Sequence, residues 1–191
     1  MKIRAGTEAD VTLAATLHAS QITEGFLPTL GRPFLSRLYR RVVRSPGSFL
    51  LVADDEGKPV GFIAGTQDVS SLYRSFLLRD GIVATLGALP AVARSARRVV
   101  ETLRYPAGEK ELPTAELLAI AVVPGARGRG AGRQLVAALT DEFQRRGIIA
   151  VKVTVGADNE EAIRLYERCG FSPAGRVEVH RGTTSQVLTW P

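Results

Sequence analysis

The sequence predicts a mixed α/β fold in which helices cover a central β-sheet. Residues 116–155 contain, in succession, an apolar strand, a glycine-rich turn, an amphipathic helix and a β-branched strand. Such a strand–helix–strand unit implies a parallel pair with a right-handed crossover. Residues 49–65 contain two strands around a turn-forming run, which is typical of an antiparallel hairpin. A chain of 191 residues without a low-complexity linker or internal repeat fits one domain, residues 1–191.

The first 45 residues predict a strand and two helices. Residues 2–5 have the pattern of a short strand. Thr7 then offers a helix N-cap with Asp10 three residues later, which predicts a helix to about Ser20. A second amphipathic helix is predicted over residues 31–45, because its apolar residues recur at helical spacing. These apolar residues are Phe34, Leu35, Leu38, Tyr39, Val42 and Val43.

The middle of the chain predicts a hairpin and then a helical insertion. Strands are expected at residues 49–53 and 60–65, separated by the turn-forming residues 54–57. Residues 68–113 differ in composition, because they are rich in alanine, leucine and arginine and are interrupted by glycine and proline. They predict two or three helices inserted between the hairpin and the last third of the chain.

The last third has the most regular pattern. An apolar strand is predicted over residues 116–123, and the helix after the glycine-rich turn is predicted to run to Arg146. The buried side of this helix is expected to consist of Leu135, Val136, Leu139 and Phe143. The remaining predicted elements are a strand at 148–155, a helix at 159–169, and two closing strands at 175–180 and 184–190 around Arg181-Gly182.

Composition indicates an ordinary globular protein and excludes several other classes. Hydrophobic residues make up 45% of the chain and charged residues 23%. No apolar run approaches the ~20 residues that span a bilayer, and the polar N-terminal residues lack the apolar core of a signal peptide. The single cysteine, Cys169, has no second thiol for a disulfide or a metal site. We therefore expect a cytoplasmic protein in a reducing compartment, with no membrane partner and no bound metal.

The net charge of +6 reflects clustered arginines. Clustered positive charge attracts anions such as nucleic acids, lipids or phosphorylated cofactors. The clusters in residues 32–44 and 94–104 are interpreted mostly as solvated helix faces. A nucleic-acid-binding protein would interleave aromatic residues with the basic ones or carry a recognition motif, and this sequence does neither. The third cluster, Arg127, Arg129 and Arg133, lies in the glycine-rich turn.

That turn, Val-Val-Pro-Gly-Ala-Arg-Gly-Arg-Gly-Ala-Gly-Arg over residues 122–133, predicts an anion site. A helix N-terminus exposes unpaired N–H groups and a partial positive charge, which together suit a phosphate. Gly128, Gly130 and Gly132 let the backbone approach an anion without an intervening side chain. The arginines of the turn add full charges nearby.

Other glycine-rich motifs fit less well. A Walker loop would need a Lys-Ser/Thr pair after its last glycine, which this turn lacks. A dinucleotide fingerprint would need a glycine where the chain has Arg133 or Leu135, and it would normally follow the first strand of its domain. A plain tight turn needs only one or two glycines and accounts for none of the arginines.

Two motifs in this order resemble the GNAT superfamily of N-acetyltransferases. The run Arg-x-x-Gly-x-Gly over residues 127–132 is similar to that family's coenzyme A signature, Arg/Gln-x-x-Gly-x-Gly/Ala. The run Asn-x-x-Ala-x-x-Leu-Tyr-x-x-x-Gly-Phe over residues 159–171 resembles the family's next helix and its Gly-Phe turn. The resemblance covers residues 114–191 well and 1–67 loosely, and it leaves 68–113 outside.

The resemblance implies a fold and a co-substrate. The fold would be a central mixed, largely antiparallel sheet with a splayed parallel strand pair, helices on both faces, and a helical insertion between strands 3 and 4. The co-substrate would be acetyl-CoA, with its pyrophosphate on the turn, its pantetheine arm along the preceding strand and its sulfur beside Tyr166. The residues implied to bind it are Ile120, Ala121, Val122, Arg127, Gly128, Arg129, Gly130, Ala131, Gly132, Arg133, Asn159 and Tyr166.

Two residues are predicted to handle the protons of acetyl transfer to an amine. An ammonium with a pKa of ~10.4 must lose a proton, and the departing thiolate needs one. Tyr166 suits the second task as a phenol; its position alone would make it a core aromatic, and the family motif favours the catalytic role. Glu116 begins an apolar strand where some family members place a catalytic glutamate, so it is the predicted base. A solvent-exposed strand-end carboxylate is the alternative for Glu116.

The acceptor side is less defined. The loop after the first helix often borders the acceptor in the family, so the resemblance implies Glu24 and His18 as substrate-binding residues. His180 is interpreted as solvated or hydrogen-bonded. Cys169 is interpreted as a small buried residue, because no base lies beside it in sequence. Direct attack by the amine is therefore preferred to an acyl-enzyme.

Three functions stay open. The leading one is N-acetylation of the primary amine of a small molecule, such as an amino sugar or an amino-acid-like metabolite. The second is acetylation of a protein N-terminus or lysine, which needs an open groove that the insertion at 68–113 would close; that insertion is alternatively a lid or a homodimer surface. The third is a non-catalytic CoA-binding regulatory module. Nucleic-acid binding is a distant fourth and would depend strongly on salt.

Overall fold

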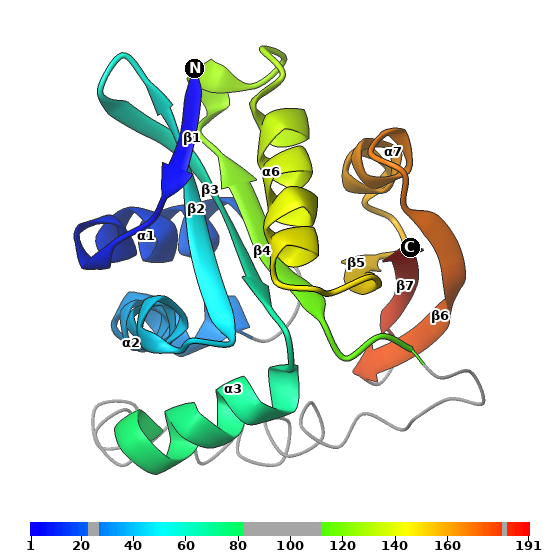
Figure 1. Ribbon diagram of the computed structural model, residues 1–191, viewed down its shortest axis with the longest axis horizontal. Helices are drawn as coiled ribbons and strands as arrows, with labels where there is room; N and C mark the ends of the chain where they lie inside the picture. The colour runs from blue at the N-terminus through cyan, green and yellow to red at the C-terminus, as the bar shows by residue number, and fades with distance from the viewer. Residues whose placement is uncertain (23–26, 82–111, 181–182) are drawn as a thin grey trace.

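A seven-stranded sheet forms the centre of the computed structural model, which describes residues 1–22, 27–81, 112–180 and 183–191 (Figure 1). The strand order across the sheet is β1-β2-β3-β4-β5-β7-β6. The strands are β1 (Lys2–Ala5), β2 (Ser48–Asp55), β3 (Lys58–Thr66), β4 (Glu116–Val122), β5 (Val151–Gly156), β6 (Ser172–His180) and β7 (Thr183–Trp190).

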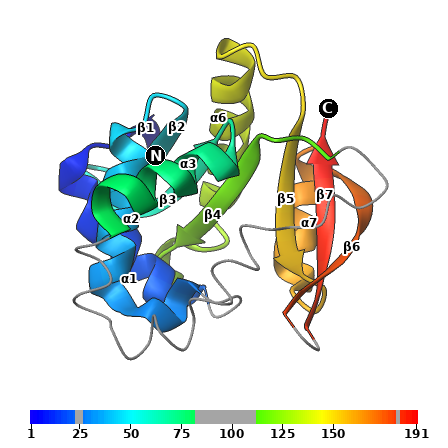
Figure 2. The same ribbon diagram turned by 90° about the horizontal axis from the view of Figure 1, so that it is seen from below.

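All neighbouring strands are antiparallel except β4 and β5. This parallel pair is joined at two positions, Glu116 beside Lys152 and Leu117 beside Val153. Beyond them the two strands run apart (Figure 2). The predicted mixed, largely antiparallel sheet with a splayed parallel pair is therefore confirmed.

Helices cover both faces of the sheet (Figure 1). The helices are α1 (Val11–Gln21), α2 (Gly31–Arg44), α3 (Val69–Phe76), α6 (Ala131–Arg145) and α7 (Glu160–Arg168), with the 3-10 turns η1 (Glu8–Asp10), η2 (Leu27–Leu30) and η4 (Pro124–Ala126) and the π-helical turn η3 (Leu77–Gly81). One apolar core lies under α1 and α2 and includes Leu35 and Phe62. The second core lies under α6 and α7 and includes Leu135 and Phe143.

The chain enters α1 through the predicted cap. The backbone N–H and the hydroxyl of Thr7 both donate to the Asp10 carboxylate, at 2.8 and 3.0 Å. Arg4 of β1 donates two more hydrogen bonds to the same carboxylate, at 2.9 and 2.7 Å. Because of the bonds from Arg4 and then from Thr7, the pKa of Asp10 falls to about 2 although the side chain is buried. The cap thereby ties α1 to β1.

The insertion between β3 and β4 begins with a helix, as predicted. Asp68 caps α3, and its side chain accepts two backbone N–H bonds from the first turn. Buried Arg41 of α2 donates to the Asp80 carboxylate at 2.7 Å, which holds η3 against α2. Arg41 is thus buried, whereas most arginines of its cluster were expected to be solvated. The helices predicted in residues 82–111 lie outside the described residues, as do residues 181–182 of the closing turn.

One predicted boundary is wrong: the strand expected from Ile148 begins later, with β5. Gly147 ends α6 in the left-handed conformation, with φ of 75°. The N–H of Ile148 then donates back to the carbonyl of Phe143 at 2.9 Å, which is the pattern of a glycine-terminated helix. The chain therefore turns at residues 147–150, and Ile149 is 83% exposed. The other described elements agree with the prediction to within about three residues.

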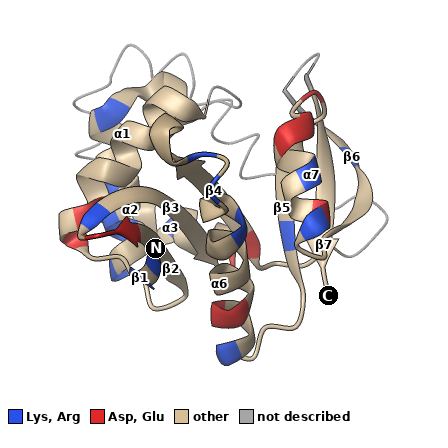
Figure 3. Ribbon diagram, turned by 90° about the horizontal axis from the view of Figure 1, so that it is seen from above, with Lys and Arg blue, Asp and Glu red and all other residues tan. Residues whose placement is uncertain are grey.

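Basic and acidic residues are interspersed over both halves of the fold (Figure 3). Arg44 of α2 forms a 2.7 Å ion pair with Glu8, and on α7 Arg164 pairs with Glu160 one turn away. The arginine cluster of α2 is therefore partly neutralised by acids from a neighbouring element; the cluster in residues 94–104 lies outside the described residues. No helix in the described part of the chain is long and apolar enough to cross a membrane.

Candidate active site

A tight turn connects β4 to α6. The 3-10 turn η4 is closed by the N–H of Ala126, which donates to the Val123 carbonyl at 3.0 Å. Gly128 and Gly130 follow with φ of 73° and 81°, in the left-handed region that favours glycine. Gly130 is the N-cap of α6, so the glycine allows the chain to reverse directly into the helix.

The geometry of this turn suits a phosphate group. The first N–H groups of a helix have no partner within the helix, and they point out of its N-terminus together with a partial positive charge. A Cβ added at Gly128 would meet no atom within 4 Å, and one at Gly130 would meet only the side chain of Gln134, at 4.0 Å. The space beside the turn is open, so a pyrophosphate can approach the backbone.

The three arginines of the turn have different surroundings. Arg127 donates from Nη2 to Oε1 of Gln21, at the end of α1, at 2.6 Å. Arg129 pairs through Nη1 with the carboxylate of Asp55, in the β2–β3 hairpin, at 3.0 Å. Arg133 is exposed on the first turn of α6. Two of the three side chains thus brace the turn against neighbouring elements, while its backbone faces open space.

The open edge of β4 lies next to this turn. The N–H of Val123 donates to a β3 carbonyl at 2.8 Å. Because bonding alternates along an antiparallel strand, the main chain of Ala121 also faces β3, whereas Ile120 and Val122 direct their main-chain groups to the β5 side. Arg127 Nε donates to the Val122 carbonyl at 3.4 Å, which agrees with this alternation. Of the three residues predicted to line the pantetheine arm, two present polar groups on the open edge.

A β-bulge bends β4 where it parts from β5. Ala64 and Gly65 of β3 oppose Ala119 and Leu117, so Leu118 between them has no opposite residue. A bulge leaves its extra residue outside the ladder and bends the strand. A side chain at Gly65 would collide with the aromatic rings packed there, because its Cβ would lie 2.7 Å from Phe49. The bulge therefore follows directly on the two parallel positions of β4.

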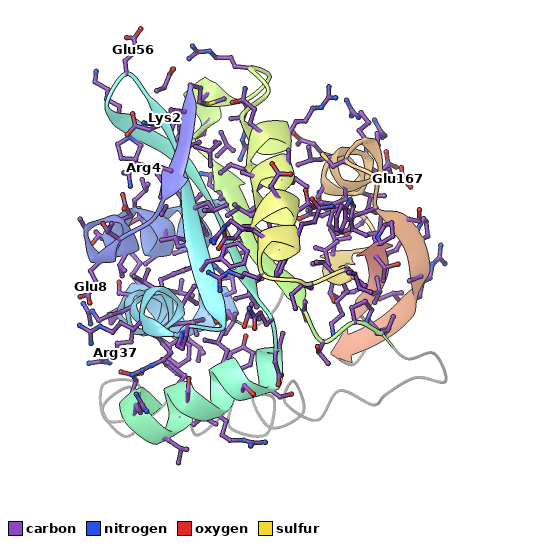
Figure 4. All side chains as sticks on the ribbon, in the orientation of Figure 1. Lys2, Arg4, Glu8, Arg37, Glu56 and Glu167 are labelled. Carbon is purple, nitrogen blue, oxygen red and sulfur yellow. The ribbon has the colours of Figure 1, made fainter. Side chains whose placement is uncertain are left out.

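Helix α7 carries the second motif. Asn159 is its N-cap, and its Oδ1 accepts the N–H of Ala162 at 3.1 Å. Tyr166 is 4% exposed and belongs to the core under α6 and α7, with its ring centroid 5.7 Å from that of Phe171. Its neighbour Glu167 lies on the outer side of the helix (Figure 4). Tyr166 thus packs as a core aromatic, and its catalytic role stays a prediction.

Glu116 lies where β4 and β5 are still joined. It is the first residue of β4, opposite Thr66 of β3 and beside Lys152 of β5. Its Oε2 atom is 3.7 Å from Lys152 Nζ, and its side chain is 20% exposed. Burial raises the pKa of Glu116 to about 7, although the charge of Lys152 acts in the opposite direction. A carboxyl group with a pKa near neutrality is suited to accept and release protons at that pH.

Sequence reasoning missed two residues near Glu116. Lys152 stands as a lone charge in the β-branched run of β5, and this interruption is the signal that points to it. Tyr73 of α3 lies close enough to Glu116 that the carboxylate, after burial, contributes to raising the pKa of the phenol. Tyr73 belongs to the insertion, where the sequence pattern gave no functional signal.

Other predicted residues lie elsewhere. His18 is 4% exposed between α1 and α2, with Nδ1 2.6 Å from the Tyr39 hydroxyl. Burial lowers the pKa of His18 to about 4, so its ring is neutral at pH 7 and packs in the core. Glu24 lies outside the described residues, and so does the side chain of His180. Cys169 is half-buried, and burial raises the pKa of its thiol. In the described ranges no group of three or more His, Cys, Asp or Glu side chains is placed to hold a metal ion.

Curated relatives match the chain over about a third of its length, and two of them illustrate this. A mycothiol acetyltransferase from Beutenbergia cavernae is 42% identical over 67 residues, which are 35% of this chain and 22% of that protein. A ribosomal protein bS18-alanine N-acetyltransferase from Salmonella typhimurium is 44% identical over 63 residues, which are 33% of this chain and 43% of that protein. The chain therefore spans less than half the length of either relative.

Fold and family comparisons extend over most of the chain. A solved structure from Salmonella typhimurium, described with its cofactor acetyl-CoA, has a TM-score of 0.59 at 21% identity and covers 98% of this chain and 91% of its own. At that identity the likeness shows the fold alone. The family described as "Acetyltransferase (GNAT) family" matches residues 17–171, which include the glycine turn and α7. The chain belongs to the GNAT acetyltransferase family.

Proposed function

We propose that the protein is an acetyl-CoA-dependent N-acetyltransferase in which a primary amine attacks the donor directly in a ternary complex. The observation that carries the proposal is the anion-binding turn at residues 128–133 beside the open edge of β4. The turn offers N–H groups to a pyrophosphate, and the edge offers main-chain groups to an arm that contains amides. Coenzyme A has both, and membership of the GNAT family supports this assignment.

The donor side is formed by the turn, the β4 edge and α7. Backbone N–H groups of residues 128–133 would hold the pyrophosphate, with Arg129 and Arg133 adding positive charge. Ile120 and Val122 would hydrogen-bond the arm, and Asn159 would contact it from the start of α7. When bound, acetyl-CoA supplies the acetyl group as a thioester.

Glu116 is the proposed base. Removing the proton from an acceptor ammonium with a pKa of ~10.4 costs about 4–5 kcal/mol of free energy at neutral pH. The carboxylate of Glu116 takes this proton directly or through a water molecule. The bulge at Leu118 leaves a main-chain N–H outside the β3 ladder, where it would stabilise the negative charge that develops on the carbonyl oxygen.

Tyr166 is the proposed acid on the donor side. Its hydroxyl would give a proton to the departing thiolate, so the thiol leaves as the amide bond forms. The buried ring fixes the direction of the hydroxyl, since packing against Phe171 and the α6 core limits its rotation.

The preferred acceptor is a small amine, as for the relative whose name specifies mycothiol. A protein N-terminus is the second candidate, because the other relative is named for the alanine of a ribosomal protein. Each relative shares only a short stretch with this chain, so neither name decides between the two. A cytoplasmic location and a homodimer remain proposals.

Calorimetric titration with acetyl-CoA tests the donor site. We expect micromolar binding to the wild-type chain and none to Gly130→Glu. The matched control is Gly147→Glu at the opposite end of α6, because Gly147 also has a left-handed φ, of 75°, and open space around it. That variant introduces the same charge and backbone strain, and it should bind like the wild type. If the wild type does not bind, or if both variants lose binding equally, the donor site is misassigned.

An acceptor screen tests the second half of the proposal. Release of free thiol would be followed with a panel of amino sugars, amino acids and polyamines, and in parallel with peptides that begin with alanine. Turnover with a small amine supports the preferred acceptor. Turnover with peptides alone would move the assignment to protein N-termini, and binding of the donor without turnover on either panel would favour the regulatory module.

A further inference from the structure

Lys152 lies where β4 and β5 are paired, and two hydrogen bonds to the segment before β4 hold it there. Its Nζ donates to the Pro113 carbonyl at 2.8 Å, and its backbone N–H donates to the Ala115 carbonyl at 2.9 Å. It shares a parallel position with Glu116, whose carboxylate is 3.7 Å from Nζ. The ammonium is therefore fixed in place by the segment that leads into β4.

The distance between Lys152 and Glu116 has a chemical meaning. A separation of 3.7 Å is too long for a hydrogen bond but close enough for strong electrostatic attraction. The ammonium also donates a hydrogen bond to the Pro113 carbonyl, which holds its charge in place beside the carboxylate.

Few other ionisable groups face Glu116 in the described residues. From α3, Tyr73 lies near the carboxylate, and because its pKa is raised it stays neutral around pH 7. From β3, the residue opposite Glu116 is Thr66, a hydroxyl without charge. From β5 comes Lys152, which alone among these groups carries a charge that opposes protonation of the carboxylate.

We propose that Lys152 is the positioning residue of the base: its ammonium, anchored on the Pro113 carbonyl, keeps Glu116 ionised and available to the acceptor amine at neutral pH. This inference rests on the proposed acetyltransferase function, in which Glu116 takes the proton. Without the ammonium, burial alone would keep the carboxyl protonated over more of the neutral range, and a protonated carboxyl cannot act as a base.

The test is the pH dependence of kcat/KM, measured from about pH 5 to about pH 9. Lys152→Gln keeps a donor for the Pro113 carbonyl and removes the charge; Lys152→Met removes both; Lys152→Arg keeps the charge. We expect the acidic limb to move up by about one pH unit or more in the Gln and Met variants. For a shift of one unit this lowers kcat/KM about 5-fold at pH 7 and about 10-fold at more acidic pH, and activity recovers on the alkaline side. Lys152→Arg should keep the acidic limb of kcat/KM at the wild-type pH.

Lys58→Met is the matched control. Lys58 is exposed at the far end of β3, about 27 Å along the strand from Thr66, and the variant loses the same charge. Its limb should stay at the wild-type pH. Acetyl-CoA affinity should be unchanged in every variant, because Lys152 lies outside the proposed donor site. An unshifted limb in both Lys152→Gln and Lys152→Met overturns the inference, whatever their thermal stability.

A second readout does not depend on turnover. NMR titration of isotope-labelled glutamate carboxyls reports the pKa of Glu116 directly, and we expect it to rise in Lys152→Gln. An unchanged pKa overturns the inference even if the enzyme is active. If Glu116→Gln keeps the acidic limb of the wild type, the proposed base is wrong, and the titration still shows separately whether Lys152 acts on Glu116.

Discussion

Gly132 of α6 lies directly against Leu165 of α7: a Cβ at position 132 would come within 3.2 Å of Leu165 Cδ2. This contact sets the distance between the helix that begins at the glycine turn and the helix that carries Tyr166. Because Gly132 has no Cβ, the Leu165 side chain can pack directly against the backbone of α6. The last glycine of the turn motif therefore serves helix packing as well as access to an anion.

Gly132→Val tests this contact. We expect a loss of about 1–3 kcal/mol in the free energy of unfolding, because the added side chain must displace Leu165. The affinity for acetyl-CoA should fall as well, since α6 and α7 would move apart. Urea unfolding and calorimetry measure the two effects. In a Leu165→Ala background the same substitution should be better tolerated, and equal losses in both backgrounds would contradict the packing argument.

Tyr166→Phe should lower kcat by about 100-fold and leave acetyl-CoA affinity nearly unchanged, because only the donated proton is removed. The control is Tyr39→Phe, which removes the hydroxyl of another buried tyrosine, on the opposite face of the sheet. That hydroxyl lies 2.6 Å from His18, so its loss should affect stability and spare turnover. Equal kcat values for Tyr166→Phe and the wild type would remove Tyr166 from the mechanism.

The two motifs were predictable because each is local in sequence. A strand end, a glycine turn and a helix start follow one another within residues 122–133, so spacing alone locates the turn proposed to bind an anion. The boundary of β5 was not predictable in this way. Ile148 and Ile149 have strand-like side chains, but Gly147 ends α6 with a backbone pattern that also uses Ile148, and this local hydrogen bonding overrides β propensity.

The sequence marks Lys152 as a lone charge in a β-branched run, but it does not show that this charge lies beside Glu116. Lys152 is separated from Glu116 by the whole of α6, and the two meet only because β4 and β5 pair in one parallel register at two positions. Nothing in either strand specifies that register. Likewise, the burial of His18 against Tyr39 depends on how α1 and α2 pack, which their periodicities do not reveal.

Glu116→Gln should abolish the acidic limb of kcat/KM and stabilise the fold at high pH. The pKa of Glu116 is raised from 4.5 to about 7, so the folded state holds its proton more tightly than the unfolded state. The charged carboxylate therefore lowers stability progressively as the pH rises from 4.5 through 7. We expect the variant to gain about 3 kcal/mol near pH 8 and less than about 1 kcal/mol near pH 5. Urea unfolding at the two pH values measures this difference in the free energy of unfolding. A stability gain that is independent of pH would contradict the raised pKa.

Asp10→Asn should destabilise the protein by about 2 kcal/mol at pH 7. The folded pKa of Asp10 is lowered from 3.8 to about 2, mainly by Arg4, so its stabilising contribution is complete above pH 3.8 and is lost as the pH falls through 2. The difference between variant and wild type should therefore shrink in acid. Asp141→Asn, an exposed position on α6, is the control and should change little. A difference that persists at the lowest pH would argue against the ionic cap.

The short junction between β4 and β5 also has a consequence for how the molecule opens. Long antiparallel ladders join β1 through β4 in one half of the sheet and β5 to β7 and β6 in the other. The seam between the two halves is the parallel β4–β5 pair, which has only two pairing positions. Local opening is cheapest where few backbone bonds must break, so amide exchange should resolve two cooperative units divided at this seam. A ligand that contacts β4 on one side and α7 on the other bridges both units. Its binding would merge the two exchange units into one. Amides that do not contact the ligand would then also exchange more slowly.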